Sequence, residues 1–225
     1  MLFVFDWDGT LSDSTEKIIV CMQRATEALS LPQLVAADVR NIIGLGLPEA
    51  IASLYSAHSY AGVSERDRRA LAQEYGRQFT EADQVPSAFF PGVLEVLSQL
   101  HLQGHKLAVA TGKSRRGLDR VLQRLDLQGF FHASRCADET ASKPDPKMLR
   151  ELLAEFDCDV SFAVMIGDTE YDMEMACRIG MARVAVSFGA HDIERLRGYN
   201  PVLCIDDMSQ LLNLELNLAL GLGLR

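Results

Sequence analysis

The pattern of apolar and polar residues changes twice along the chain, and these changes divide the predicted structure. The run Phe3-Val4-Phe5 stops abruptly at Asp6, which is typical of a buried strand that carries a carboxylate at its C-terminal end. Beyond it, with Asp13 or Ser14 as the expected N-cap, apolar residues recur at helical spacing without a strand pattern. The expected helical stretches are 14–31, 36–42, 48–58 and 65–83.

The second change comes where Val85-Pro86-Ser87 and Phe90-Pro91-Gly92 interrupt the helical pattern and predict a linker. From residue 92 onward, helical stretches alternate with short apolar runs, which indicates a parallel sheet covered by helices. The expected strands are 106–110, 132–135, 162–166, 183–186 and 202–204, and the expected helices are 93–103, 114–125 and 146–156.

These patterns together predict an α/β fold with a Rossmann-like parallel-sheet core and one insertion. The core consists of residues 1–13 and 86–225, and an all-α cap domain, residues 14–85, is inserted after the first strand. The leucine-rich tail 211–225 allows two interpretations, a closing helix with a frayed end or an apolar surface used in self-association. We favour the closing helix, and the sequence leaves both a monomer and a homodimer open.

Composition narrows the class of protein. The 225 residues are 48% hydrophobic, which is sufficient for a packed interior. An apolar run of membrane-spanning length is absent from the sequence, as is a basic segment before the first apolar stretch, so we expect a cytoplasmic protein without a signal peptide. The five cysteines are odd in number and form no C-x-x-C pair, which favours buried thiols over disulfides or a zinc site.

The charge balance of the sequence limits the kinds of molecule that the protein is expected to bind. With 22 basic and 31 acidic residues, the formal net charge of −9 disfavours nonspecific nucleic-acid binding, so an anionic substrate needs local positive charge at its site. Four arginines near helix 114–125 are interpreted as its solvated face, although either of the first two could reach an anionic substrate. They are Arg115, Arg116, Arg120 and Arg124.

The first candidate for chemistry is the sequence Asp6-Trp7-Asp8-Gly9-Thr10 at the end of the first strand. Two neighbouring buried carboxylates are costly unless a cation, a proton or hydrogen bonds compensate them, and a divalent metal would do so. Gly9 permits a sharp turn, and the Thr10 hydroxyl is expected to fold back onto the local backbone. The alternative is an aspartate-rich turn without a catalytic role.

The second candidate is Thr111-Gly112-Lys113-Ser114, between a strand and a helix. It offers a hydroxyl and backbone N–H groups at a helix N-terminus, where an anion binds favourably. It is not a P-loop, because the first glycine of that motif would fall at Leu107, inside a strand. The alternative is a structural Ser/Thr turn or helix cap.

The third candidate is Lys143, within Ser142-Lys143-Pro144-Asp145-Pro146. The following proline restricts the backbone of Lys143, so its ammonium group has a fixed origin from which to hold a phosphate. Asp145 and Pro146 are expected to begin the next helix as N-cap and first residue. The alternative is a solvated lysine in a proline-rich loop.

The fourth candidate is the segment around Gly167-Asp168, where a strand ends, with Asp172 one turn into the next helix. Acidic residues in a first helical turn can also be simple caps, which is the alternative interpretation. Together with Asp6 and Asp8, the two carboxylates form an oxygen-rich set suited to Mg²⁺, which prefers a few carboxylates plus water and substrate phosphate.

In this order along the chain, the four motifs resemble those of the haloacid dehalogenase superfamily of phosphatases. The resemblance covers nearly the whole chain and implies the fold of that superfamily, with the helical insertion similar to its C1 cap. Within the cap, Gly44-Leu45-Gly46-Leu47-Pro48-Glu49 resembles the phosphoglycolate phosphatases and their close relatives. The resemblance thus implies a Mg²⁺-dependent hydrolase of a small phosphorylated metabolite, such as a phosphoglycolate-like monoester.

The resemblance also implies roles for individual residues. Asp6 is the expected nucleophile, which forms an aspartyl-phosphate, and Asp8 is the expected general acid and base. Mg²⁺ is expected to be bound by Asp6, Asp168 and the Asp8 carbonyl. Lys143 and Thr111 are expected to hold phosphoryl oxygens, with Gly112 donating a backbone N–H, while Asp172 orients a metal-bound water or Lys143.

Related activities can be compared with the same residues. Dehalogenases of the superfamily lack the second aspartate and phosphonoacetaldehyde hydrolases carry a small residue there, so Asp8 disfavours both. The β-phosphoglucomutase-like pattern has a histidine near the position of Ile18 and an arginine near that of Leu47. This chain has neither, which favours transfer of the phosphoryl group to water over transfer to a sugar. A pyrophosphatase, a sugar-phosphate phosphatase and, from another class, a non-catalytic phospho-ligand-binding module stay open. Substrate choice is expected to depend on cap residues 41–50.

Overall fold

The fold is described by a computed structural model of the chain, covering residues 1–56, 60 and 62–213. A single parallel sheet has the strand order β3-β2-β1-β4-β5-β6. Five of its strands match the segments expected from the sequence to within a residue or two, and β1 matches the first apolar run. The strands are β1 (Leu2–Phe5), β2 (Lys106–Thr111), β3 (Ala133–Cys136), β4 (Ala163–Gly167), β5 (Ala182–Val186) and β6 (Leu203–Ile205).

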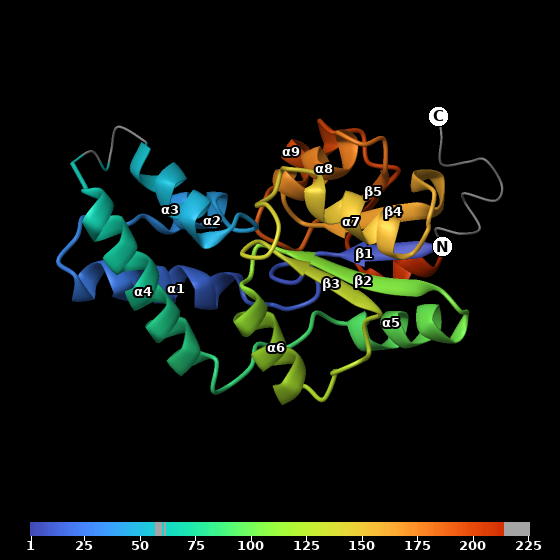
Figure 1. Cartoon of the computed structure of the whole chain (residues 1–225), viewed down its shortest axis with the longest axis horizontal. Helices are drawn as coiled ribbons and strands as arrows, with labels where there is room; N and C mark the ends of the chain where they lie inside the picture. Colours follow the sequence, from blue (N-terminus) through green and yellow to red (C-terminus); the bar gives the residue numbers. More distant parts are fainter. Residues whose placement is uncertain (57–59, 61, 214–225) are drawn as a thin grey trace.

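Helices cover both faces of the sheet, as Figure 1 shows. On one face α5 (Val93–Leu102) and α6 (Arg115–Arg124) pack over the strands, and on the other lie α7 (Lys147–Glu155) and α8 (Glu170–Cys177). Successive side chains of a strand point to opposite faces, so Phe3 and Phe5 of β1 pack with α5 and α6. Leu2 and Val4 pack with α7 and α8. Burial on both faces explains why this strand is apolar throughout.

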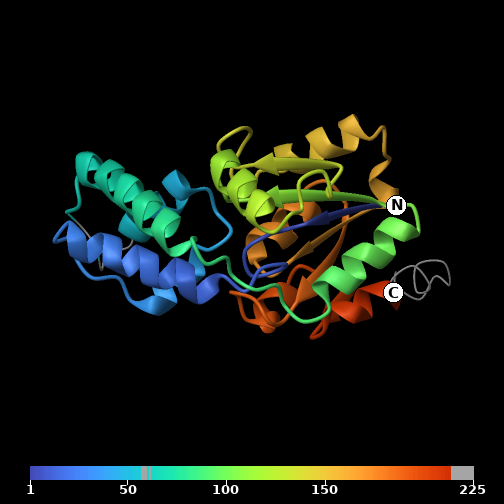
Figure 2. The same ribbon diagram turned by 90° about the horizontal axis from the view of Figure 1, so that it is seen from below.

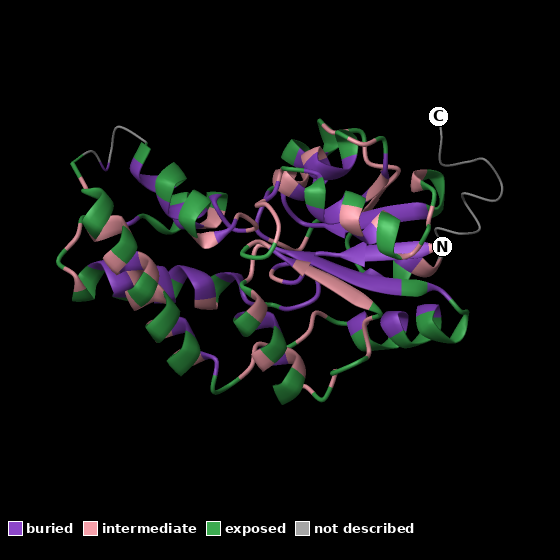
Figure 3. Cartoon of the chain, viewed as in Figure 1, coloured by how far each residue is buried: buried purple, intermediate pink, exposed green. Residues whose placement is uncertain are grey.

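The chain leaves the sheet after β1 and returns to it with α5 and β2, and α1 to α4 between them form a separate helical layer beside the core (Figures 1 and 2). Its described residues form helices without strands, as expected for a cap. These helices are α1 (Thr15–Ala28), α2 (Ala36–Asn41), α3 (Leu47–Ser56) and α4 (Glu65–Ala82). Their inward faces are buried in a cluster that is separate from the core of the sheet, and Figure 3 shows the buried stripes of these helices.

Three local expectations were wrong. The helix after Lys143 begins one residue later than expected, because Pro146 is its N-cap and Asp145 instead accepts a hydrogen bond from the Lys147 N–H. Phe162 ends a short 3₁₀ turn, η2 (Val160–Phe162), before β4 and is 62% exposed. The short helix α9 (Ile193–Arg197) was not anticipated, because five residues are too few for a helical period to be recognised.

The expectations for the C-terminal tail and for the cysteines were only partly met. The beginning of the tail forms a 3₁₀ helix, η3 (Met208–Asn213), with Leu211 buried against the core, and the rest of the expected closing helix lies outside the described residues. All five cysteines are free, but only Cys21 and Cys136 are buried and Cys177 is exposed. Within the described ranges, no helix has the length and apolarity needed to cross a membrane.

The separate cap core leads to a prediction for stability. Leu71 of α4 is 0% exposed in the cap cluster, so Leu71→Ala removes packed methyl groups and leaves a cavity. We expect the free energy of unfolding to fall by about 2–5 kcal/mol, measured by urea denaturation followed by circular dichroism. Leu102→Ala makes the same change at a side chain that is 85% exposed, and it should alter this free energy by no more than about 0.5 kcal/mol. Equal losses in the two variants would contradict the assigned packing.

Candidate active site

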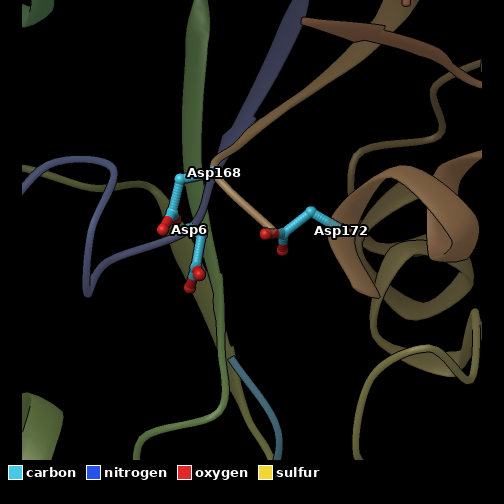
Figure 4. Close-up of side chains that lie close together, drawn as sticks. All are labelled: Asp6, Asp168 and Asp172. Atoms are coloured by element: carbon cyan, nitrogen blue, oxygen red, sulfur yellow. The ribbon is translucent and has the colours of Figure 1, made fainter. Parts of the chain in front are cut away.

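The two aspartates Asp6 and Asp168 follow adjacent strands. β1 lies between β2 and β4, and the chain builds β2 and β3 on one side of it before it crosses to β4, β5 and β6 on the other. Ligands of open parallel sheets bind at such a reversal, beside the carboxyl ends of the strands. Both carboxylates are buried there and lie side by side, with Asp172 of α8 facing them, as Figure 4 shows.

Lys143 is buried between two of these carboxylates. Its Nζ lies 2.7 Å from Asp6 Oδ1 and 2.6 Å from Asp172 Oδ1. Burial by itself lowers the pKa of a lysine, yet the charges of Asp172 and Asp6 raise the pKa of Lys143 above its ordinary value. Lys143 is therefore a permanent cation whose position is fixed from two sides.

The remaining charge at this site is negative. Burial raises the pKa of Asp6 well above its ordinary range, Lys143 opposes this rise, and Asp172 and Asp168 add to it. Burial likewise raises the pKa of Asp168 to about 7, with a further contribution from Asp172 and opposing hydrogen bonds from the Ala190 N–H and the Thr10 hydroxyl. Three buried carboxylates thus face the single ammonium group of Lys143, and this excess of negative charge favours binding of a cation or a proton.

These carboxylates can hold a divalent metal ion. Asp6, Asp168 and Asp172 each offer an oxygen within 4.8 Å of the others. Asp6 Oδ2 is buried and has no hydrogen-bond partner among the described residues, so one ligand atom is free for coordination. Carboxylate oxygens are the ligands that Mg²⁺ prefers, and a cation here would remove the unfavourable charge.

The Asp168 carboxylate is held tightly by its surroundings. Its Oδ1 accepts a hydrogen bond of 2.7 Å from Thr10 Oγ1, and its Oδ2 accepts one of 2.7 Å from the Ala190 N–H. A Cβ atom at Gly9 or Gly189 would collide with this carboxylate, and Gly9 also has a φ of 87°. The expectation that Thr10 bonds to its local backbone is wrong, because its hydroxyl reaches the buried carboxylate of the neighbouring strand.

Asp8 has different neighbours. Ser14 Oγ donates to its Oδ1 over 2.7 Å, and Lys113 Nζ lies 2.9 Å from its Oδ2. The ammonium group of Lys113 also lies 4.6 Å from the ring centroid of Phe79 on cap helix α4. The sequence analysis did not assign Lys113 a role, although a cation directly after Thr111-Gly112 at a strand end was an available signal.

Thr111 and Gly112 lie at the end of β2. The buried Thr111 hydroxyl accepts a hydrogen bond of 3.1 Å from the Lys113 N–H, and Ser114 caps α6 by accepting one from Gly117. The structural Ser/Thr turn and the helix N-cap that were the alternative interpretation of this segment are therefore present. Both residues also border a cavity of about 760 Å³ that contains Asp6 and Asp8. A Cβ atom on Gly112 would lie 2.5 Å from the Leu45 carbonyl oxygen, so the cap approaches the core closely here.

Asp172 combines a capping role with a contact to the buried lysine. Thr169 and Asp172 form a capping box at the start of α8, in which Asp172 Oδ2 accepts hydrogen bonds from the Thr169 N–H and hydroxyl. Its other oxygen contacts Lys143. The two interpretations of this aspartate are thus compatible, because each uses a different oxygen.

A buried histidine that the sequence analysis missed joins cap and core. His191 Nδ1 accepts a hydrogen bond from the Glu170 N–H, so the proton is on Nε2, which donates to the Asn41 carbonyl oxygen over 3.2 Å. The Tyr171 hydroxyl donates to the same oxygen over 2.7 Å, and Arg195 binds the Asn41 side chain. Burial lowers the pKa of His191, which keeps the ring neutral.

The fold and the buried charges at its carboxyl edge define a capped α/β enzyme. The chain matches the family model described as haloacid dehalogenase-like hydrolase over residues 3–186, and it belongs to that family. The resemblance inferred from the four motifs is thereby confirmed, and the helices between β1 and β2 agree with a C1 cap.

Relatives carry phosphatase names. The chain is 32% identical to "Probable phosphatase IndB" of Dickeya dadantii, over 93% of this chain and 90% of the relative. It is 36% identical to a phosphoglycolate phosphatase of Caulobacter vibrioides, over 82% of this chain and 78% of the relative. A crystal structure described as a predicted phosphoglycolate phosphatase from Haemophilus somnus has a TM-score of 0.86 at 23% identity, covers 95% of this chain and 97% of its own, and supports the fold.

The raised pKa of Asp168 predicts a pH dependence for the metal-free protein. The carboxyl has a pKa near 3.9 in an unfolded chain and about 7 in the folded one, so folding takes up a proton between these values. Because the folded state binds more protons, the free energy of unfolding falls as pH rises from about 4 to 7, by at most about 1.4 kcal/mol per pH unit.

The measurement is urea unfolding in EDTA from pH 4 to 8, for the native sequence and for Asp168→Asn. As pH rises, the free energy of unfolding of the native sequence should fall relative to that of Asp168→Asn. Added Mg²⁺ at pH 8 should raise this free energy for the native sequence but not for the variant. A difference between the two that does not change with pH would contradict the assigned titration.

Proposed function

We propose that this protein is a Mg²⁺-dependent phosphatase that hydrolyses a small phosphomonoester through an aspartyl-phosphate. The observation that carries the proposal is the state of Asp6. Its carboxylate is buried at the floor of a cavity, one oxygen contacts Lys143, and the other has no hydrogen-bond partner within the described ranges. A carboxylate that is oriented in this way but not saturated by hydrogen bonds can act as a nucleophile.

In the first step, an oxygen of Asp6 attacks phosphorus, and the bond from phosphorus to the leaving alcohol breaks. A carboxylate needs no deprotonation near neutral pH, so this attack requires no base. In the second step, water attacks the phosphorus of the aspartyl-phosphate and releases inorganic phosphate, which restores Asp6. Mg²⁺ bound by Asp6, Asp168 and the Asp8 carbonyl would neutralise repulsion between the anionic nucleophile and the anionic phosphate.

Asp8 is the proposed proton carrier. It borders the same cavity as Asp6, and the Ser14 hydroxyl and the Lys113 ammonium fix the direction of its carboxylate. In the first step it gives a proton to the departing alkoxide, and in the second it accepts one from the attacking water. The proton that Asp8 takes from water in the second step replaces the one that it gives to the alkoxide in the first.

In this proposal, a defined set of residues binds the transferred phosphoryl group. Lys143 and the Thr111 hydroxyl bind its oxygens, and Gly112 donates a backbone N–H at the same strand end. Asp172 positions Lys143 through the ion pair of 2.6 Å. Because the named relatives include phosphoglycolate phosphatases, phosphoglycolate is a natural first substrate to test.

Three other functions are compatible with the same fold. A pyrophosphatase or a sugar-phosphate phosphatase would differ only in the leaving group, which the cap selects. A phospho-ligand-binding module would instead bind phosphate esters in calorimetry without releasing phosphate. The unsaturated Asp6 carboxylate favours turnover over simple binding, because a site that only binds a phosphate dianion gains nothing from an anionic oxygen without a hydrogen-bond partner beside it.

The first test concerns the nucleophile. With Mg²⁺ the protein should hydrolyse p-nitrophenyl phosphate, EDTA should abolish the activity, and Asp6→Asn should lower kcat by about 10⁴-fold or more. Asp13→Asn makes the same substitution at an exposed residue seven positions later and should retain normal turnover. Normal turnover by Asp6→Asn would show that the nucleophile is wrongly assigned.

The second test separates the two steps. The p-nitrophenolate leaving group needs no proton, whereas attack by water needs a base, so Asp8→Asn should slow the second step far more than the first. Rapid mixing of this variant with p-nitrophenyl phosphate should release about one nitrophenolate per protein in a burst, followed by a slow steady state. A slow linear release without a burst would argue against Asp8 as the base of the second step.

A further inference from the structure

The cavity at Asp6 and Asp8 is larger than a two-carbon phosphate ester requires. Its volume is about 760 Å³, and volumes of roughly 300–1,000 Å³ are typical of sites that bury drug-sized ligands. Apolar side chains of α1, α3, α4 and the loop between α2 and α3 form one part of its wall, and polar and charged side chains, mainly of α4 and α6, form another. The apolar side chains include Ile18, Met22, Ile43, Leu47, Tyr75 and Phe79.

The volume does not result from a cap that has moved away from the core. Asn41 of the cap is hydrogen-bonded to Tyr171 and His191 of the core. The Gly46 N–H donates to Ser142 Oγ over 2.8 Å. At the cavity itself, Lys113 of the core contacts the Phe79 ring of α4. The cap is therefore seated on the core at several points while the cavity keeps this size.

The cations that border the cavity are already paired, with one exception. Lys113 is paired with Asp8, Arg120 with Asp83, and Arg77 with both Glu74 and Glu81. Arg116 has no ion pair with any described residue, but it is exposed at the surface of α6. A carboxylate two bonds from the phosphate ester oxygen would lie beside Asp8, whose neighbour Lys113 is already paired, and the unpaired Arg116 is exposed, so this arrangement is unfavourable.

Two aromatic residues of α4 belong to the apolar part of the wall. The Tyr75 and Phe79 rings lie one turn apart, with their centroids 5.7 Å from each other. Burial, and then the charge of Asp8, raise the pKa of Tyr75 well above its ordinary value, so its phenol stays neutral. An apolar or aromatic group of a substrate can pack against these rings, and the Tyr75 hydroxyl can accommodate a polar substituent on it.

We propose that the leaving alcohol of the natural substrate is bulky and uncharged, with an apolar or aromatic group that packs between α1 and α4 of the cap. The proposal rests on the proposed phosphatase function and specifies its substrate class. It separates this protein from enzymes that act on phosphoglycolate, whose leaving group is small and carries a carboxylate. The phosphoryl transfer itself is unchanged, with the ester oxygen leaving as a protonated alcohol.

The test compares kcat/KM for three alkyl phosphates in the presence of Mg²⁺. They are 2-phenylethyl phosphate, ethyl phosphate and phosphoglycolate, all esters of primary alcohols, so differences in leaving-group chemistry are small. Burial of the phenyl group should make kcat/KM for 2-phenylethyl phosphate about tenfold or more higher than for ethyl phosphate. Phosphoglycolate should be no better than ethyl phosphate. A higher value for phosphoglycolate than for 2-phenylethyl phosphate would overturn the proposal.

A pair of matched variants tests whether the phenyl group binds in the cavity. Ala72 of α4 borders the cavity, whereas Ala70 of the same helix is not among the residues that border it. Ala72→Phe should reduce the preference for 2-phenylethyl phosphate over ethyl phosphate by about fivefold or more, because the new ring occupies the same space. Ala70→Phe should leave this ratio unchanged. An equal change of the ratio in both variants would contradict binding of the phenyl group between α1 and α4.

The outcomes distinguish this inference from the proposed function. If none of the three esters, and no aryl phosphate, is hydrolysed in an Asp6-dependent reaction with Mg²⁺, the phosphatase assignment fails. If hydrolysis depends on Asp6 and Mg²⁺ but phosphoglycolate is the best substrate, the phosphatase assignment holds and only the substrate class is wrong.

Discussion

The buried ammonium group of Lys143 is the interaction on which the site depends. It lies between Asp6, at the end of β1, and Asp172, in the first turn of α8, and so joins three segments that are distant along the chain. Removing one partner of such a buried pair leaves an uncompensated charge, which is strongly destabilising. With Asp168 beside them, the carboxylates still exceed the cations. Burial, together with this imbalance, raises the pKa values of Asp6 and Asp168 and favours a metal ion.

The cap adds a second constraint that is independent of the first. It is hydrogen-bonded to the core through Asn41 at the end of α2 and through Gly46 in the loop before α3, and α4 reaches the core through the contact of Phe79 with Lys113. Lys113 also pairs with Asp8, so the direction of the proposed proton carrier is linked to the position of the cap. In the proposed mechanism, core residues supply the reaction, and the shape and charge of the cap wall would select the leaving group.

Much of the fold could be predicted from the sequence, because strands buried on both faces and amphipathic helices have distinct periods. The strands, the main helices and the insertion after β1 were predicted for this reason. The errors are local. Phe162 precedes its strand in an exposed turn, α9 is too short to show a period, and the apolar pattern carries no information on the exposure of a single residue such as Cys177. Tertiary contacts decide such cases.

The sequence by itself predicted that Asp6 and Asp168 lie together, because each directly follows a strand and parallel strands place such ends at one edge. It also singled out Lys143, in the loop between β3 and α7, as a cation of the same site. The tertiary structure alone decided the pairing of Lys113 with Asp8 and the contacts of Asn41 with His191, which join residues more than 100 positions apart. Local periodicity specifies which face of an element is buried. It does not specify which loops meet, because that depends on how the finished helices and strands pack.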